Sequence, residues 1–249
     1  MPDTVVEFAG VSLIYHERHG ETSAIDDLSF SVKRGEFVSI VGPSGCGKTS
    51  VLSLVAGIIE PSAGAIRLEG GRPGYMLQQD HLLDWRTIEG NVLLGLEVRR
   101  ALTPESRAYA MNLLARYGLG EFRSHYPPQL SGGMRQKVAL IRTLATAPDV
   151  LLLDEPFSAL DFQTRLRVSD EMHTIIKKEG KTALLVTHDI SEAISMGDRV
   201  LVFTKRPTRL KCEHAISLAG GGSPIDRRNA PEFKDYFNMI WKELDVNET

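Results

Sequence analysis

The feature that most constrains the fold of this chain is a glycine-rich loop, Gly42-Pro43-Ser44-Gly45-Cys46-Gly47-Lys48-Thr49. An apolar run at 37–41 precedes the loop and a helical stretch at 48–56 follows it. This strand, loop and helix order is the setting in which the pattern G-x-x-x-x-G-K-[ST] binds phosphate. The glycines let successive backbone N–H groups face phosphate oxygens, aided by the positive end of the helix. We expect Lys48 to reach the β- and γ-phosphates of a nucleotide and the Thr49 hydroxyl to bind Mg²⁺.

Two adjacent carboxylates follow a second apolar run. Asp154 ends the run that begins at Val150, and Glu155 comes next. In open α/β sheets, ligands bind at the carboxyl ends of parallel strands. We therefore expect Asp154 to hold Mg²⁺, directly or through water, and Glu155 to orient and polarise an attacking water. The alternative, a solvated strand end, loses weight beside a phosphate-binding loop.

The rest of the pattern predicts an α/β fold with a P-loop NTPase core and a mostly parallel sheet. The unbroken apolar runs at 150–153 and 183–186 are typical of strands buried on both faces, and alternation at 5–13 and 24–32 predicts an N-terminal antiparallel β portion. We interpret the chain as one domain, with an α/β core at 1–79 and 148–219, a helical subdomain at 80–147 and a C-terminal extension at 220–249.

Local signals place the helices. Thr103 and Pro104 predict a helix start that Gly118 ends, and further helices are expected over 131–147 and 164–179. Asp189 to Glu192 has the pattern of a capping box. Gly220 to Ser223 predicts a flexible break, after which Phe233, Phe237, Ile240, Trp241 and Leu244 fall on one helical face that we expect to pack on the core.

Composition limits the location and the partners. The net charge of −3 gives no global basic field for nucleic acid. The two cysteines suggest no disulfide framework, the N-terminus does not resemble a signal peptide, and no apolar segment is long enough for a membrane helix. We expect a cytoplasmic protein, peripheral on the inner face of the cell membrane if it serves a membrane, with no nucleic-acid partner.

A second anion site is predicted at Leu130-Ser131-Gly132-Gly133-Met134-Arg135-Gln136. Ser131 can cap a helix, and the two glycines expose backbone N–H groups at the helix start. Two phosphate sites in one domain would be redundant unless one of them completes a site on another subunit.

These motifs together resemble the nucleotide-binding subunit of ATP-binding-cassette (ABC) transporters, over nearly the whole chain and in the same order. The segment 130–136 matches that family's signature almost letter for letter. The resemblance implies that the signature of one protomer closes over the γ-phosphate held by the P-loop of the other. Two ATP molecules would then lie between a chain and a second copy of itself, or a homologous cassette.

The resemblance also implies roles for single residues. Tyr15 would stack on adenine, although the polar stretch from His16 to Thr22 is longer than usual and a plain surface tyrosine stays an alternative. Gln78 would sense Mg²⁺ and the attacking water and link the site to a permease. Because Gln79 follows directly, the sequence leaves open which of the two glutamines has this role. His188 would contact the γ-phosphate and support Glu155.

The complete set of implied residues divides by role. Catalysis would involve Glu155, His188 and Gln78, and Mg²⁺ would be held by Thr49, Gln78 and Asp154. Nucleotide would be bound by Tyr15, residues Gly42 to Thr49, Ser50, Ser131, Gly132, Gly133, Gln136 and Asp161, the last of which ends a loop, Ser158 to Asp161, that communicates between the two sites.

A further resemblance indicates an importer. The segment from Leu82 to Thr87 is similar to the Leu-Leu-Pro-Trp segment of importer ATPases for nitrate, sulfonate and taurine, with Asp84 in place of the proline; thiamine-precursor importers share these features. Trp85 would contact a transmembrane permease, or else pack within the helical subdomain. An extracytoplasmic solute-binding protein would be an indirect partner.

Three rival functions are less consistent with the sequence. A soluble cassette in nucleic-acid or translation processes, the main alternative, would be expected to carry a coiled-coil insertion or a second cassette. A non-catalytic scaffold would be expected to lack Lys48, Glu155 or His188, and all three are present. An exporter is disfavoured because no membrane domain is fused to the chain.

Overall fold

The structure is a computed structural model that describes residues 3–17, 20–219 and 222–245. Its strands are β1 (Thr4–Glu17), β2 (Gly20–Lys33), β3 (Phe37–Val41), β4 (Ala63–Leu68), β5 (Gly74–Met76), β6 (Val150–Asp154), β7 (Thr182–Val186), β8 (Arg199–Phe203) and β9 (Leu210–Ala215). Its α-helices are α1 (Lys48–Val55), α2 (Ile88–Val98), α3 (Pro104–Arg116), α4 (Gly132–Leu144), α5 (Phe162–Lys178), α6 (Ile190–Met196), α7 (Pro224–Arg228) and α8 (Phe233–Asp245).

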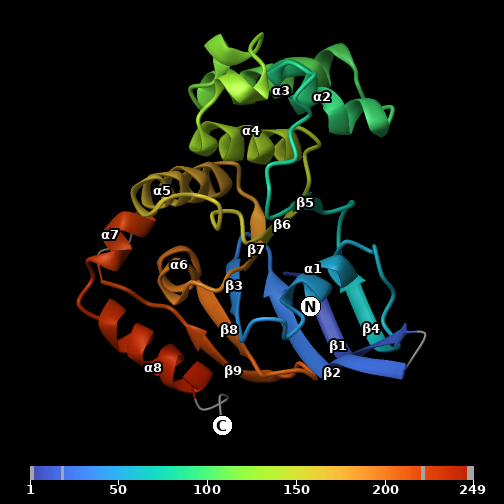
Figure 1. Cartoon of the computed structure of the whole chain (residues 1–249), viewed down its shortest axis with the longest axis vertical. Coiled ribbons are helices and arrows are strands. Elements are labelled where there is room, and N and C mark those ends of the chain that lie inside the picture. The colour runs from blue at the N-terminus through green and yellow to red at the C-terminus, as the bar shows by residue number, and fades with distance from the viewer. Residues whose placement is uncertain (1–2, 18–19, 220–221, 246–249) are drawn as a thin grey trace.

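The strands form two sheets. The larger has the order β5-β6-β7-β3-β8-β9, in which every neighbouring pair is parallel except β8 and β9. The smaller is antiparallel, with the order β2-β1-β4, and it lies beside α1 at the lower right of Figure 1. The predicted combination of a mostly parallel sheet and an N-terminal antiparallel portion is confirmed.

The apolar runs of the parallel strands are explained by burial on both faces. Along β6, Leu151 and Leu153 belong to the hydrophobic cluster that includes α4 and α5. The alternate residues Val150 and Leu152 belong to the cluster beneath α1 and the antiparallel sheet. Because successive side chains of a strand point to opposite faces, both sets must be apolar.

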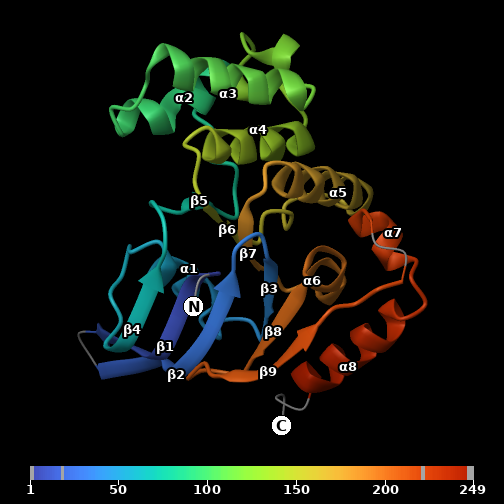
Figure 2. The ribbon, with the colours of Figure 1, turned by 180° about the vertical axis from the view of Figure 1, so that it is seen from behind.

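Helices α2, α3 and α4 form a lobe at one end of the molecule, seen at the top of Figures 1 and 2. Thr103 caps α3 as predicted, with Pro104 in its first turn. The predicted helix over 131–147 is three residues too long, because α4 ends at Leu144 and Ala147 has a φ of 48°. No helix in the described part of the chain is both long enough and apolar enough to cross a membrane.

The C-terminal segment corrects one prediction. Gly220 and Gly221 of the predicted break lie outside the described residues. After them, α7 lies beside α5 and α6, and α8 packs against α6 and β8 (Figure 1). Ile240 is fully buried against β8 and α6 as expected. Trp241, however, is 54% exposed, because it lies one residue, about 100°, further round the helix. The aromatic face of α8 therefore packs on the core only in part.

Candidate functional site

The glycine-rich loop joins β3 to α1 as predicted. Gly47 is the N-terminal flanking residue of α1, and its φ of 117° is accessible without strain only to glycine. The Lys48 side chain folds back over the loop, with Nζ donating to the carbonyl oxygens of Gly42 at 2.8 Å and Pro43 at 3.0 Å. Cys46 is buried beneath the loop. The loop is thus held in shape by the ammonium group of Lys48, which is itself only 7% exposed.

The carboxylate of Asp154 lies directly beside the start of α1. It is only 6% exposed, and it accepts hydrogen bonds from the Thr49 hydroxyl at 3.2 Å and the Tyr75 hydroxyl at 3.3 Å. Burial raises the pKa of Asp154, and the bonds from Thr49 and Tyr75 oppose that shift. Burial and the charge of Asp154 raise the pKa of Tyr75 to about 12, so the phenol stays a donor at neutral pH.

This donor set fits Mg²⁺. The ion prefers oxygen ligands and is commonly held by one or two carboxylates together with substrate phosphates. Asp154 supplies a buried carboxylate and Thr49 a hydroxyl next to the phosphate-binding loop, which is the combination that the sequence predicts. A divalent cation would also offset the penalty of burying the Asp154 charge.

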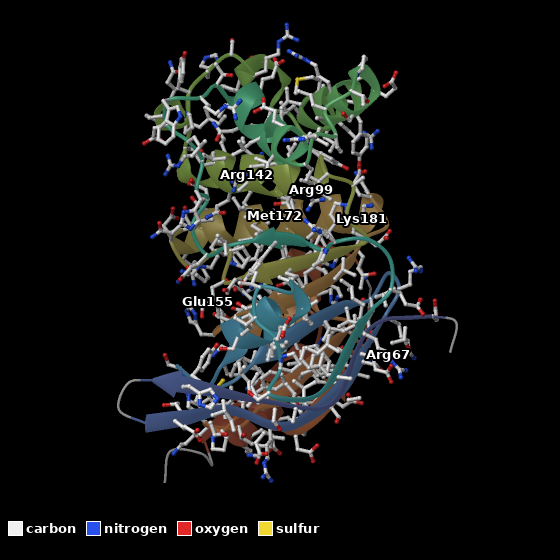
Figure 3. The ribbon with its side chains drawn as sticks, turned by 90° about the vertical axis from the view of Figure 1, so that its right-hand side faces the viewer. Arg67, Arg99, Arg142, Glu155, Met172 and Lys181 are labelled. Carbon is white, nitrogen blue, oxygen red and sulfur yellow. The ribbon has the colours of Figure 1, made fainter. Side chains whose placement is uncertain are left out.

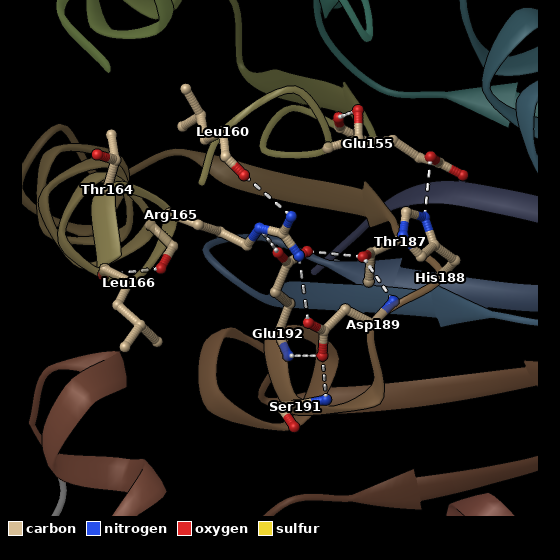
Figure 4. Close-up of polar contacts among 12 residues, drawn as sticks. Glu155, Leu160, Thr164, Arg165, Leu166, Thr187, His188, Asp189, Ser191 and Glu192 are labelled. Carbon is tan, nitrogen blue, oxygen red and sulfur yellow. Dashed lines mark hydrogen bonds and ion pairs between the residues drawn. The ribbon is translucent and has the colours of Figure 1, made fainter. Parts of the chain in front are cut away.

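Glu155 and His188 form the second polar pair of the site. The His188 Nδ1 lies 3.0 Å from the Glu155 Oε2, although the two residues are 33 positions apart (Figure 4). The amide of Gln78 lies 3.5 Å from the same Oε2 and 3.3 Å from the Ser158 hydroxyl. Of the two adjacent glutamines, Gln78 is therefore the one that points to the carboxylate. Glu155 has a φ of 44°, a left-handed backbone conformation that is uncommon for a residue with a side chain.

Two side chains border the loop from other elements. Tyr15, near the end of β1, reaches α1, and its hydroxyl lies 3.0 Å from the Ser50 hydroxyl. Arg206 donates to the Gly45 carbonyl at 2.8 Å, and it lines the same cavity of about 500 Å³ as Lys48, Thr49, Glu155 and His188. The segment Lys205-Arg206-Pro207 resembles that of the importer group, but the sequence gave Arg206 no role at the loop, because it follows β8, far from the loop in the chain.

The signature segment lies in a separate cavity of about 520 Å³. Its wall is formed by 131–134, by 159–161 and by side chains of α4 and α5, among them Lys137, Arg167 and Glu171, of which Lys137 and Glu171 form an ion pair at 2.9 Å. Ser131 caps α4 by accepting from the Met134 N–H at 3.3 Å. The two predicted phosphate-binding segments thus face different cavities of one protomer.

The structure treats two residues that we predicted to bind nucleotide differently. Gln136, on α4, is only 3% exposed and does not line the signature cavity. Asp161 does line that cavity, but its carboxylate also accepts from the Thr164 N–H at 3.0 Å and caps α5. This cap starts α5 at Phe162, two residues before the predicted start.

A network that sequence reasoning missed ties the loop before α5 to the segment around His188 (Figure 4). Arg165 donates to the Leu160 carbonyl at 3.0 Å and lies 3.8 Å from both Asp189 and Glu192. The predicted capping box is only half correct: Asp189 caps α6, but Glu192 accepts from the Thr187 hydroxyl at 2.7 Å instead of closing the box. Arg165 therefore links the loop that contains Leu160 to the segment that follows His188.

Replacing Asp154 by Asn is expected to raise the Tm of the ligand-free protein. The same change should abolish the increase in Tm that Mg²⁺ causes. The folded-state pKa of Asp154 is raised, so stability falls as pH rises from the unfolded value toward the folded one. The gain in Asp154→Asn should be full at pH 7 and should shrink as pH falls through this range. We expect a rise in Tm of a few degrees, about the shift that 1 kcal/mol gives in a domain of this size.

Calorimetry at a series of pH values, with and without Mg²⁺ and nucleotide, measures this effect. Asp149→Asn, which changes a carboxylate just before the same strand, is the matched control. An equal loss of Tm at every pH would contradict the assignment of a charge penalty to Asp154.

Comparison with known proteins agrees with this geometry. The sequence profile described as ABC transporter matches residues 25–158. The ABC transporter ATP-binding protein YtlC of Bacillus subtilis is 48% identical over 246 residues, covering 96% of this chain and 95% of that protein. The taurine import ATP-binding protein TauB of Jannaschia sp. is 37% identical, covering 89% and 88%.

Solved structures give the same result. A dimeric post-hydrolysis state of the ATP-binding cassette MJ0796, bound to ADP and Pi, has a TM-score of 0.71 and 30% identity to this chain, covering 85% of it and 99% of that chain. A second dimeric structure of MJ0796, a bacterial ABC transporter cassette, has a TM-score of 0.72. The chain therefore belongs to the ABC transporter family, as an ATP-hydrolysing ATP-binding cassette.

Proposed function

We propose that this cassette is the ATPase subunit of an importer for a small solute, peripheral on the inner face of the membrane, and that it works as a head-to-tail dimer around two ATP molecules. The main support for the dimer is that the two phosphate-binding segments border two different cavities. The loop at 42–49 faces one cavity and the signature at 131–134 faces the other. A two-fold axis would pair each segment with the opposite one of the second copy.

Within each composite site, the residues divide the work of hydrolysis. The backbone N–H groups of 42–49 and the Lys48 ammonium would bind the phosphates, and the signature of the partner would add donors at the γ-phosphate. Glu155 would orient and polarise the attacking water, with His188 supporting the carboxylate at 3.0 Å. Tyr15, hydrogen-bonded to Ser50, would stack on adenine.

Mg²⁺ would be held by Thr49 and Asp154, with Gln78 close by. When bound, the ion would neutralise part of the charge that develops on the phosphates. The buried carboxylate of Asp154 keeps its orientation through the bonds from Thr49 and Tyr75, so the ion would find its ligands already ordered.

Communication with a permease would run through the segment that follows Gln78. Asn91 on α2 is fully buried, accepts from the Leu83 N–H at 2.7 Å and donates to the Leu83, Arg86 and Thr87 carbonyls. This anchor leaves the Trp85 ring 76% exposed. A rigid loop that presents an exposed aromatic ring is suited to a protein contact rather than to internal packing.

The lobe is also tied directly to this segment. Arg142 on α4 donates to the carbonyls of Asp80 at 2.6 Å and His81 at 2.7 Å. Arg135 of the signature helix pairs with the Asp80 carboxylate at 3.0 Å. Figure 3 shows Arg142 in the lobe and Glu155 below it. A movement of the lobe would therefore displace the segment that contains Gln78 and Trp85.

The importer assignment is supported by the relatives named taurine import ATP-binding protein, and we propose taurine, other sulfonates or nitrate as the solutes to test first, with thiamine precursors next. A permease and an extracytoplasmic solute-binding protein complete the proposed system. The solute would be selected by those partners, because the cavities at 42–49 and 131–134 carry phosphate-binding groups.

Glu155→Gln should lose at least about 100-fold in ATP hydrolysis, the usual contribution of a general base. The amide keeps the shape of the carboxylate, so ATP binding should persist and the unhydrolysed ATP should trap a dimer. Phosphate release and light scattering measure the two effects. Glu121→Gln, an exposed glutamate in the lobe, should behave like the parent. Hydrolysis at the parent rate in Glu155→Gln would remove Glu155 from the mechanism.

The composite site is tested by mixing two inactive variants. Lys48→Ala removes the P-loop charge, and Ser131→Arg blocks the exposed start of the signature. A change at Gly133 is less suitable, because a Cβ there would lie 2.7 Å from the Val168 side chain of the same protomer. In random pairing the mixture should recover about a quarter of the parent activity, since half of the dimers would contain one intact site of two.

The control mixture combines Lys48→Ala with Glu155→Gln. Both lesions lie on the P-loop side, so each composite site of a mixed dimer keeps one of them and no activity should return. Equal activity of the two mixtures would refute the head-to-tail pairing.

Trp85→Ala should leave the ATPase activity of the isolated cassette unchanged but weaken its coupling to the permease. The assay is stimulation of the ATPase by solute-loaded binding protein in vesicles that contain the permease, with taurine as the first solute. Ile58→Ala, which shortens another exposed apolar side chain, just after α1, should couple normally. Normal coupling by Trp85→Ala would mean that the ring does not contact the permease.

A further inference from the structure

A third cavity adjoins the nucleotide cavity. Its volume is about 480 Å³, and it is lined by the loop residues 42–44 together with His188, Ile190, Lys205, Trp241 and Leu244. It shares Ser44 and His188 with the cavity that holds the catalytic residues. Helix α8 thus forms one wall of a cavity at the edge of the P-loop. The residues that we propose for ATP hydrolysis do not include this wall.

The wall on α8 is apolar and held in place. Trp241 is 54% exposed, and its ring stacks on Phe237 with centroids 6.2 Å apart and planes inclined by 15°. The next turn of the helix places Leu244 in the same cavity. An ordered, half-exposed indole beside a leucine is suited to receive an apolar group.

An unpaired aromatic side chain lies at the other end of the catalytic segment. Phe162, the first residue of α5, is 68% exposed. The loop before it is rigid: the Ser158 hydroxyl donates to the Glu155 carbonyl at 3.0 Å, and Arg165 donates to the Leu160 carbonyl at 3.0 Å. Phe162 is therefore presented to solvent by a preorganised loop, which lowers the entropic cost of a contact.

The position of this loop determines what Phe162 can meet. The segment 155–161 begins at the nucleotide cavity and ends at the signature cavity of the same protomer. In the proposed head-to-tail dimer it must cross the interface between the two composite sites, close to the two-fold axis. Its end at the signature cavity would then face the partner's P-loop edge, because the cavity walled by Trp241 adjoins the nucleotide cavity there.

We propose that Phe162 of each protomer inserts into the cavity between the P-loop and α8 of a second copy of this chain, so that Trp241 and Leu244 form a docking site for the partner. The inference rests on the proposed dimer and deepens it, because the contact would fasten the catalytic segment of one subunit to the P-loop edge of the other. Two-fold symmetry provides the contact twice in each dimer.

Cross-linking between two differently tagged proteins tests the contact directly. Both carry Glu155→Gln, to trap the dimer, and Cys212→Ser, to remove the half-buried thiol. One also carries Phe162→Cys and the other Trp241→Cys. With ATP and a short bismaleimide, a covalent heterodimer is expected, and none is expected without nucleotide. Val98→Cys, at an exposed site in the lobe, replaces Trp241→Cys as the control and should not cross-link to position 162.

An affinity measurement gives an independent readout. In the Glu155→Gln background, Phe162→Ala should weaken ATP-dependent dimerisation roughly 100-fold, because burying a phenylalanine contributes about tenfold and the dimer contains two such contacts. Binding of a fluorescent ATP analogue to the dilute monomer should be unchanged. Phe162→Leu should recover much of the affinity, and Val98→Ala should dimerise like the parent.

The outcomes separate this inference from the proposed function. If Glu155→Gln dimerises with ATP but positions 162 and 241 fail to cross-link and Phe162→Ala dimerises as tightly as its parent, the docking site is refuted and the sandwich dimer stands. If Glu155→Gln does not dimerise with ATP at all, the proposed dimer fails and this inference fails with it.

Discussion

The parallel pairing of β6, β7 and β3 is the arrangement on which the rest of the structure depends. Parallel strands have their carboxyl ends at the same edge of the sheet, so the segments that follow these three strands meet there. Lys48 follows β3, Asp154 ends β6 with Glu155 directly after it, and His188 follows β7. Each strand can be buried on both faces only because α1 and the antiparallel sheet cover one side and α4, α5 and α6 cover the other.

That edge carries features that disfavour the folded state without ligands. Asp154 is a buried carboxylate whose pKa is raised by burial, and Glu155 adopts a φ of 44°. Both features are consistent with a site that binds phosphate and a cation. A bound cation compensates a buried negative charge, and an unusual backbone conformation can fix the direction of a side chain. The rigid core around the edge supplies the stability that tolerates them.

Communication in this cassette depends on short segments that touch two functional regions at once. The segment 155–161 runs from the Glu155 carboxylate to the signature cavity, and Arg165 connects it to the residues after His188. Likewise, the segment after Gln78 is bound by Arg142 and Asn91 to the helical lobe, and it exposes Trp85. In the proposed transporter, ATP in one cavity would thereby be sensed both by the second subunit and by the permease.

The sequence by itself determined the phosphate-binding loop, the paired carboxylates, the signature and the α/β architecture, because these features depend on local spacing and on the burial of whole strands. The tertiary structure decided which side chains meet. It selected Gln78 over Gln79 as the neighbour of Glu155, left Gln136 out of the signature cavity, and brought in Tyr75, Arg165 and Arg206, to which the sequence had given no role at the site. It also turned Trp241 away from the core, since a helical pattern identifies an apolar face but not how much of it a neighbouring element covers. Contacts between segments distant in the chain depend on how the sheet and its helices pack, and local sequence does not encode that packing.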